Sequence, residues 1–577
     1  MISPAQKMAS NVRRQINHRA ETVLSEPALW QRRVRLGFWI FGLASGSILA
    51  YTTRHYINGD AIAYLDMADA LRRGLWSESV NLTYAPGYPL LLSLAQTLIP
   101  IDALNEITLA KLLNLLCFVV AMAVCDLFVR ELITFSEQKG TNAGLPFPAL
   151  SAICFSSFLF TSLTWVRVQI ITPDMLVFIF LMLCAIAIMR ILSYPEGYRG
   201  FIFLGLVAGL GYLSKTSFFP FSAIVFVCAA AACRSVTHAI PRFLAALAVM
   251  LLVSSPVLIS QSLEVGRPSI GEAGTYNYAY WVSGAGQPVH QPEVIHEDPK
   301  VLVYRHEPVS TYPPGDDPSY WALGIRPVFD IGAQVRAIRN NLEHLLGRTG
   351  LIGLVIIVWF VAQFRRAKLT RITLHPPSLS LVLILFAVAG VAMHCLVVME
   401  IRYVGPFLFL GIVGLALLPR FDRTVPDDRS GTVLQAALLT FFFLANVAYF
   451  VVDESIRAAY TAPGKVSHSE VFAEGVALKE FFDRVGVGKG DEIVIFRPPG
   501  GPLYWARMAG VRATGEIADA KDFLDQGARH RALLLNSLKH AGFKAVVAKG
   551  PAFAALLSEG WFKPAGTRDY YVYVFAR

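Results

Sequence analysis

The chain has 577 residues, of which 55% are apolar and only 16% charged, and its mean hydropathy is +0.50. Soluble domains carry about 25% charged residues, so this composition excludes a purely soluble protein. The net charge of +10 does not indicate nucleic-acid binding, because Lys and Arg lie largely in short links between apolar runs. All seven cysteines lie inside apolar runs, so no disulfide framework or CxxC metal site is expected.

The N-terminal region is polar. Residues 1–35 include seven Lys or Arg side chains and no small-residue cleavage site of the kind that ends a secretory signal. We therefore expect a cytoplasmic tail followed by a membrane anchor.

Apolar runs long enough for membrane helices follow the tail. We predict eleven spans, at about residues 36–54, 108–130, 147–166, 170–191, 200–214, 218–233, 242–262, 349–364, 377–398, 403–419 and 431–452. With the N-terminus in the cytoplasm, this count puts the basic links inside, as the positive-inside rule requires. Segment 84–100 is apolar but short, and as a span it would put the later basic links outside. We predict instead a helix that lies at, or dips into, the outer face.

This topology places residues 55–107, 263–348 and 453–577 outside the cytoplasm. The last segment has a composition typical of a small α/β domain. Its predicted strands are "DEIVIF", "FKAVVA" and "YYVYVFAR", and residues 522–542 have the pattern of an amphipathic helix. The expected architecture is a polytopic α-helical membrane protein of about 11 transmembrane helices, with a transmembrane domain at 36–452 and a C-terminal extracytoplasmic α/β domain.

Ionisable residues gather at the predicted outer ends of the spans, where such residues are candidates for function. They are Asp60, Asp174, Lys215, Glu400 and Arg402, with Tyr403 beside them.

Each of these residues also has a purely structural interpretation. Asp60 would cap the helix that begins after it, and Asp174 would favour a helix N-terminus. Lys215 would extend to the lipid headgroups, and Glu400 with Arg402 would form an interfacial ion pair of little energy. Their shared position on one face of the membrane favours a site that holds a polar headgroup while its lipid tail lies among the helices.

The outer loop 263–348 contains "TYNYAYW" (275–281), whose aromatic side chains suit either stacking on sugars or anchoring at the membrane interface. It also contains His290, His296 and His306, whose spacing matches no defined metal site.

Several short motifs, in order, resemble the GT-C superfamily of membrane glycosyltransferases. They are "GDAIAYLDMADALRRG", "YAPGYPLLLSL", "TPDMLVFIFLML", "GLVAGLGYLSKTS" and "EIRYVGPFLFL". Within that superfamily the pattern is similar to protein O-mannosyltransferases and lipid A aminoarabinose transferases. The resemblance covers about residues 36–420. It implies a GT-C fold and an enzyme that moves a sugar from a polyprenyl-phosphate carrier to an acceptor outside the cytoplasm, with inversion.

The resemblance also implies residue roles. Asp60 matches the catalytic acid of the first loop, Asp174 matches the acid at the outer start of the fourth span, and Lys215 and Arg402 match basic residues near the carrier phosphate. Ala61 stands where many relatives have a second acid, which leaves a divalent metal open as the cofactor. Tyr84 and Ala85 stand where aminoarabinose transferases have a Lys.

We therefore expect Asp60 to be the general base of a polyprenyl-phosphate-sugar-dependent glycosyltransferase. The expected substrate-binding residues are Asp174, Lys215, Glu400, Arg402, Tyr403 and Tyr84. The expected partners are a polyprenyl-phosphate-linked sugar, a glycan, lipid or protein acceptor, and membrane lipids. The expected location is the bacterial inner membrane. The alternative function is a transporter or flippase, which would place polar residues near the bilayer midplane on broken helices.

Overall fold

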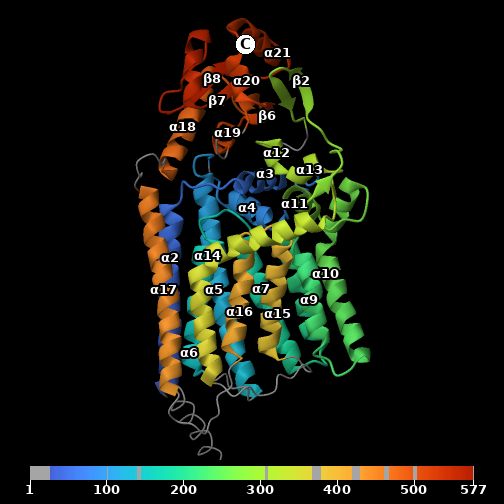
Figure 1. Cartoon of the computed structure of the whole chain (residues 1–577), viewed down its shortest axis with the longest axis vertical. Coiled ribbons are helices and arrows are strands. Elements are labelled where there is room, and N and C mark those ends of the chain that lie inside the picture. The colour runs from blue at the N-terminus through green and yellow to red at the C-terminus, as the bar shows by residue number, and fades with distance from the viewer. Residues whose placement is uncertain are drawn as a thin grey trace, which may run out of the picture.

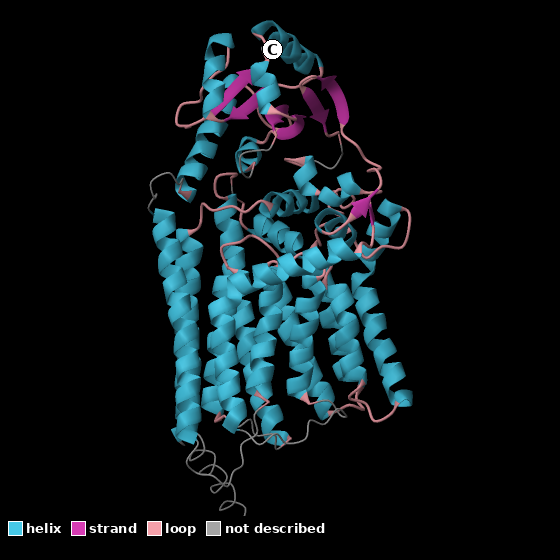
Figure 2. Cartoon of the chain, in the orientation of Figure 1, coloured by secondary structure: helices cyan, strands magenta, loops and turns pink. Residues whose placement is uncertain are grey.

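The computed structural model describes residues 26–100, 102–139, 145–305, 310–366, 378–418, 429–459, 467–497 and 503–575. Most of the described chain is helical, and a single larger sheet lies beyond one end of the helical bundle (Figures 1 and 2).

Each predicted span corresponds to one apolar helix of the bundle. Seven are long and apolar enough to cross a membrane: α2 (Glu26–Thr52), α5 (Glu106–Gln138), α6 (Phe147–Phe160) with its π-helical continuation η1 (Thr161–Val166), α7 (Asp174–Ser193), α10 (Val236–Val265), α14 (Ile331–Arg366) and α17 (Arg429–Ala459). Four are shorter: α8 (Tyr198–Ser214), α9 (Phe218–Ala230), α15 (Leu379–Cys395) and α16 (Ile401–Ala416). The expected polytopic α-helical architecture is therefore confirmed.

Helix α14 begins well before the predicted span at 349–364. Its first half carries an exposed apolar stripe formed by Ile331, Val335, Leu342 and Leu346. These positions recur at helical spacing. Figure 1 shows this half crossing the end of the bundle before the helix turns along its neighbours.

The segment at 84–100 forms a separate short helix, as predicted. This is α4 (Gly87–Leu98), which packs against α3 (Asp60–Arg72) at the end of the bundle nearest the sheet (Figure 1). The first residue of α4 must be small, because a Cβ at Gly87 would lie 2.6 Å from the carbonyl oxygen of Leu213. This close approach brings the start of α4 to the end of α8.

The loop between α10 and α14 also lies at this end of the bundle (Figure 1). Its elements are α11 (Ala273–Trp281), α12 (Pro313–Asp316), α13 (Pro318–Ala322) and the two-stranded ribbon of β1 (Gly284–Ala285) and β4 (Arg326–Pro327). None of the residues of α11 is buried.

The six-stranded sheet has the order β2-β3-β6-β5-β7-β8, with β5 parallel to β6 and β7 and the other pairs antiparallel. Its strands are β2 (Glu293–Glu297), β3 (Lys300–Val303), β5 (Glu492–Phe496), β6 (Arg512–Ile517), β7 (Ala545–Lys549) and β8 (Tyr570–Val574). Two of these strands, β2 and β3, come from the loop between α10 and α14, so the sheet joins that loop to the C-terminal segment.

Helices cover both faces of this sheet. They are α18 (His468–Val485), α19 (Tyr504–Ala509), α20 (Ala520–Asp525), α21 (Ala528–His540) and the 3-10 helix η3 (Pro551–Glu559). The single amphipathic helix predicted at 522–542 is wrong, because the chain is extended at Gln526 and Gly527 and separates α20 from α21. Ile493 and Ile495 of β5 pack into the bundle-side core, whereas Val494 and Phe496 pack into a second core on the other face. This double burial explains why β5 is a continuous apolar run.

Candidate functional site

The loop that follows α2 delivers Asp60 to the end of the bundle nearest the sheet. Helix α3 starts at Asp60, its N-cap residue is Gly59, and no side chain caps it. The structure thus contradicts the helix-cap interpretation of Asp60. Its carboxylate instead accepts a hydrogen bond of 2.8 Å from Nη2 of Arg402, at the start of α16.

Asp174 is the first residue of α7 and is almost fully buried. It accepts hydrogen bonds from Nζ of Lys215 at 2.6 Å and from Oγ1 of Thr172 at 2.9 Å. Nη1 of Arg402 lies 3.6 Å from the same carboxylate. Arg402 therefore bridges Asp60 and Asp174, and Lys215 pairs with Asp174.

Aromatic rings surround these charges. Nζ of Lys215 lies 3.4 Å from the ring centroid of Tyr403, and the guanidinium of Arg402 lies 4.9 Å from the same ring. The ring of Tyr84 contacts that of Tyr64 at a centroid distance of 5.0 Å. Burial and then the Asp60 carboxylate raise the pKa of Tyr84 well above its ordinary value, so its hydroxyl stays protonated and able to donate.

Glu400 lies outside this group. Its side chain is exposed, and Arg402 pairs with Asp60 and Asp174 instead of with its sequence neighbour. The predicted interfacial pair between Glu400 and Arg402 is therefore wrong. Glu400 has an extended backbone and is the N-cap residue of α16, whereas Arg402 lies within the first turn of that helix.

Three polar side chains that sequence reasoning missed hold the loop in front of Asp174. Oδ1 of Asn58 accepts the backbone N–H of Ile171 at 2.9 Å, which ties this loop to the one that precedes Asp60. On α5, Asn114 donates to the carbonyl oxygens of Val168 and Ile170, and the buried amine of Lys111 donates to that of Gln169. A buried Lys and Asn three residues apart in an apolar span is a signal that could have identified them.

The histidines of the outer loop do not gather. His290 stacks on Tyr320 with ring centroids 3.9 Å apart, His296 contacts the carbonyl oxygen of Pro299 at 3.1 Å, and His306 lies outside the described residues. Across the described ranges, no group of three or more His, Cys, Asp or Glu side chains is arranged to hold a metal.

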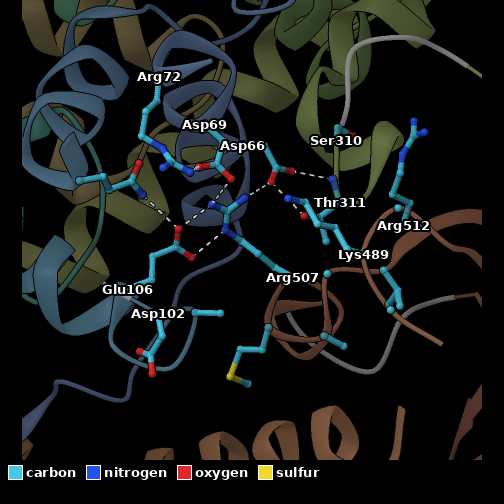
Figure 3. A pocket seen from close by; sticks show the side chains of 18 of the residues that line it. Asp66, Asp69, Arg72, Asp102, Glu106, Ser310, Thr311, Lys489, Arg507 and Arg512 are labelled. Carbon is cyan, nitrogen blue, oxygen red and sulfur yellow. Dashed lines mark hydrogen bonds and ion pairs between the residues drawn. The ribbon is translucent and has the colours of Figure 1, made fainter. Parts of the chain in front are cut away.

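A second charged cluster connects the C-terminal segment to α3. Figure 3 shows Arg507 of α19 among three carboxylates. Its guanidinium pairs with Asp66, with Asp69 at 3.0 Å and with Glu106 at 2.6 Å. These groups line part of a cavity of about 980 Å³. The cluster joins residues more than 400 positions apart, so no local pattern could reveal it.

Asp66 also fixes the outer loop. It accepts hydrogen bonds from the backbone N–H and the hydroxyl of Thr311, at 2.7 and 2.9 Å. Burial raises the pKa of Asp66, and Arg507 opposes that shift by favouring the charged form. Asp66 of α3 thus connects the segment between α2 and α5, the loop between α10 and α14, and the C-terminal segment.

The charged group at the start of α16, formed by Asp60, Asp174, Lys215 and Arg402, has the side chains that a group transfer requires. Two carboxylates and two cations compensate one another, and Asp60 is the more accessible acid, with a side chain 36% exposed against 3% for Asp174. An accessible carboxylate can accept a proton from an incoming hydroxyl, and the two cations can hold an anionic leaving group.

No protein-family model and no curated protein sequence matches the chain. Its fold is similar to that of ArnT, the lipid A aminoarabinose transferase, from Cupriavidus metallidurans. In its structure bound to undecaprenyl phosphate, ArnT has 10% sequence identity to this chain. The TM-score is 0.52, and the match covers 93% of this chain and 98% of ArnT. The apo structure is 11% identical, with a TM-score of 0.54 over 93% and 97%.

The apo oligosaccharyltransferase of Archaeoglobus fulgidus is 11% identical, with a TM-score of 0.46 over 89% of this chain and 69% of that protein. The likeness to ArnT shows that this chain has the GT-C fold, as the sequence motifs predicted.

Proposed function

We propose that this protein transfers a sugar from a polyprenyl-phosphate carrier to an acceptor outside the cytoplasm. The observation that carries the proposal is the group of Asp60, Asp174, Lys215 and Arg402 at one end of an apolar bundle. The likeness to ArnT, which has been solved with undecaprenyl phosphate, supports the choice of carrier.

The reaction is a single inverting displacement. The acceptor oxygen forms a bond to the anomeric carbon while the bond from that carbon to the phosphate oxygen breaks. Asp60 takes the proton of the acceptor hydroxyl, and Arg402 and Lys215 stabilise the departing polyprenyl phosphate. The phosphate is already a good leaving group, so charge neutralisation and positioning supply most of the catalysis.

The other predicted residues orient the reactants. Asp174 holds Lys215 and Arg402 in place through the contacts described above. Tyr403 and Tyr84 form walls beside these charges, and Tyr84 keeps a proton to donate to a sugar oxygen. Glu400, which is exposed, would meet the acceptor rather than the carrier phosphate.

Transferase and flippase differ in what happens to the carrier. Purified protein in liposomes that contain a radiolabelled polyprenyl-phosphate sugar should release polyprenyl phosphate when envelope acceptors are added. Mass spectrometry of envelope glycans and lipids from a deletion strain should show a missing sugar, which identifies the acceptor. Movement of the intact donor across the bilayer, with no free polyprenyl phosphate, would favour the flippase.

We further propose that the site faces away from the cytoplasm of a bacterial inner membrane. Single cysteines at Ser77 and Ser469, both exposed at the sheet end of the protein, should react with an impermeant thiol reagent in intact cells. A cysteine at Ser235, in the exposed link between α9 and α10 at the opposite end, should react only after permeabilisation. The background protein would lack the seven native cysteines, which are all buried and free. Labelling of Ser235 alone in intact cells would reverse the orientation.

A further inference from the structure

Arg167 has an unusual backbone conformation. Its φ is +69° and its ψ is 114°, and within the described residues it is the one non-glycine residue with a positive φ. It follows directly on η1, a six-residue π-helical turn. Both features cost conformational energy and tend to be kept where function requires them.

Few contacts hold the Arg167 side chain. Its Nε donates to the carbonyl oxygen of Thr164 at 3.1 Å, and its guanidinium lies 5.6 Å from the ring centroid of Phe450. Among the residues that the structure describes, no carboxylate lies within ion-pair distance of it, and its two Nη groups make no hydrogen bond. Arg402 and Arg507, by contrast, each pair with two or more carboxylates. Arg167 therefore has a charge and four N–H donors to offer a ligand.

The Arg167 guanidinium lies at the same polar end as the predicted catalytic acid. Tyr56, four residues before Asp60, has a pKa raised above its ordinary value by burial. Of its charged neighbours Arg167 has the largest effect on that pKa, followed by Glu454, Arg402 and Asp60. Arg167 and Arg402 thus both favour the ionised form of Tyr56, against the larger effect of burial.

Close packing between η1 and α16 holds the end of η1, and with it Arg167, near the start of α16, where Arg402 lies. A Cβ at Gly405, three residues after Arg402, would lie 3.3 Å from Cγ2 of Thr161 and from Cβ of Trp165. The absence of a side chain at Gly405 lets the π-helical turn approach α16 closely. Arg167 is the residue directly after this turn.

The charges of the site are balanced without a ligand, so an incoming phosphate calls for a further positive charge. Asp60 and Asp174 already neutralise Arg402 and Lys215. The amine of Lys111, 5.2 Å from the centroid of the Tyr56 ring, already donates to the carbonyl oxygen of Gln169. A phosphate that enters this group brings at least one more negative charge. An Arg side chain is well suited to it, because its planar fork donates two parallel hydrogen bonds to phosphate oxygens.

We propose that Arg167 binds the phosphate of the carrier lipid together with Arg402 and Lys215. This inference rests on the proposed function and adds to it a residue that the sequence motifs do not include. The positive φ of Arg167 sets the direction in which its side chain leaves the end of η1, and this role would account for the strained backbone there.

The test is binding of polyprenyl phosphate to purified protein in phosphatidylcholine nanodiscs. Wild type would be compared with Arg167→Gly, Arg167→Lys and Arg402→Ala. The matched control is Arg54→Gly, because Arg54 also donates to one backbone carbonyl oxygen, at 2.9 Å, and stacks on one ring, that of Tyr51 at 4.4 Å. Polyprenol, which has no phosphate, would be the control ligand.

We expect Arg167→Gly to weaken binding of polyprenyl phosphate about tenfold, the scale of one charge-assisted hydrogen bond, without changing binding of polyprenol. Arg167→Lys should restore the affinity only in part. The thermal unfolding temperature of Arg167→Gly should equal or exceed that of wild type, because glycine adopts a positive φ at little cost. This result would separate loss of a ligand contact from loss of fold.

Two outcomes would overturn the inference. Wild-type affinity in Arg167→Gly, together with a loss in Arg402→Ala, would remove Arg167 and leave the proposed function standing. Equal displacement of polyprenyl phosphate by phosphatidylglycerol would show a general lipid-phosphate contact instead of a carrier site. If wild type does not distinguish polyprenyl phosphate from polyprenol, the proposed function itself fails.

Discussion

Replacement of Asp60 by asparagine is expected to lower the rate of sugar transfer at least about a hundredfold, the usual contribution of a general base. Asparagine keeps the size of the side chain and its hydrogen bond to Arg402, but it cannot take the proton of an acceptor hydroxyl. Affinity for the lipid-linked donor should change little. The measurement is single-turnover transfer by purified protein, with donor binding measured separately in nanodiscs.

Asp102→Asn is the matched control for this experiment. Asp102 is an exposed aspartate in the same stretch between α2 and α5, and its Oδ1 accepts the backbone N–H of Asn105 at 3.0 Å, a role that asparagine can also fill. Its rate should equal that of wild type. A normal rate in Asp60→Asn would reduce Asp60 to an ion-pair partner of Arg402.

The second large effect concerns the attachment of the C-terminal segment. Arg507→Met should destabilise the protein by about 3–5 kcal/mol, the usual effect of removing one partner from a buried ion-pair network. The substitution leaves Asp66, Asp69 and Glu106 without their shared cation. The expected result is a lower unfolding temperature in detergent and faster release of a C-terminal fragment by protease.

Neutralising the carboxylates should restore part of this loss. Arg507→Met combined with Asp66→Asn and Glu106→Gln no longer buries unpaired charge, and the three changes are coupled rather than additive. Arg339→Ala removes an exposed pair with Glu343 on α14 and should have little effect. If Arg507→Met behaves like Arg339→Ala, the cluster does not hold the segment to α3.

Local pattern was enough for much of this protein. Apolar run length located the eleven helices, and the positive-inside rule separated α4 from them. Asp60, Asp174, Lys215, Arg402 and Tyr403 meet in space because each begins or ends a helix at the same end of the bundle, and alternation of spans is sufficient to place them there.

The remainder depends on contacts that no local pattern records. Asp66 and Arg507 are 441 residues apart, and nothing near either residue identifies its partner. Strand β6 is "RATGEI", which lacks the apolar run of β5. The sequence alone does not identify it as a strand, because its burial comes from pairing with β3 and β5. A positive φ at Arg167 is also invisible in the sequence, because glycine or asparagine would normally mark such a position.

The strand order of the sheet delays its completion until late in synthesis. Strand β3 is made early and ends at Val303, whereas its partner β6 begins at Arg512, 209 residues later (512 − 303). At translation rates of about 5–20 residues per second, the β2–β3 hairpin waits roughly 10–40 s for that partner while four further helices are inserted. Through that interval Val301 and Val303 have no cover from the C-terminal segment. A nascent chain that stops before β6 would expose an unpaired apolar strand edge, which makes such truncated products candidates for aggregation and for quality control.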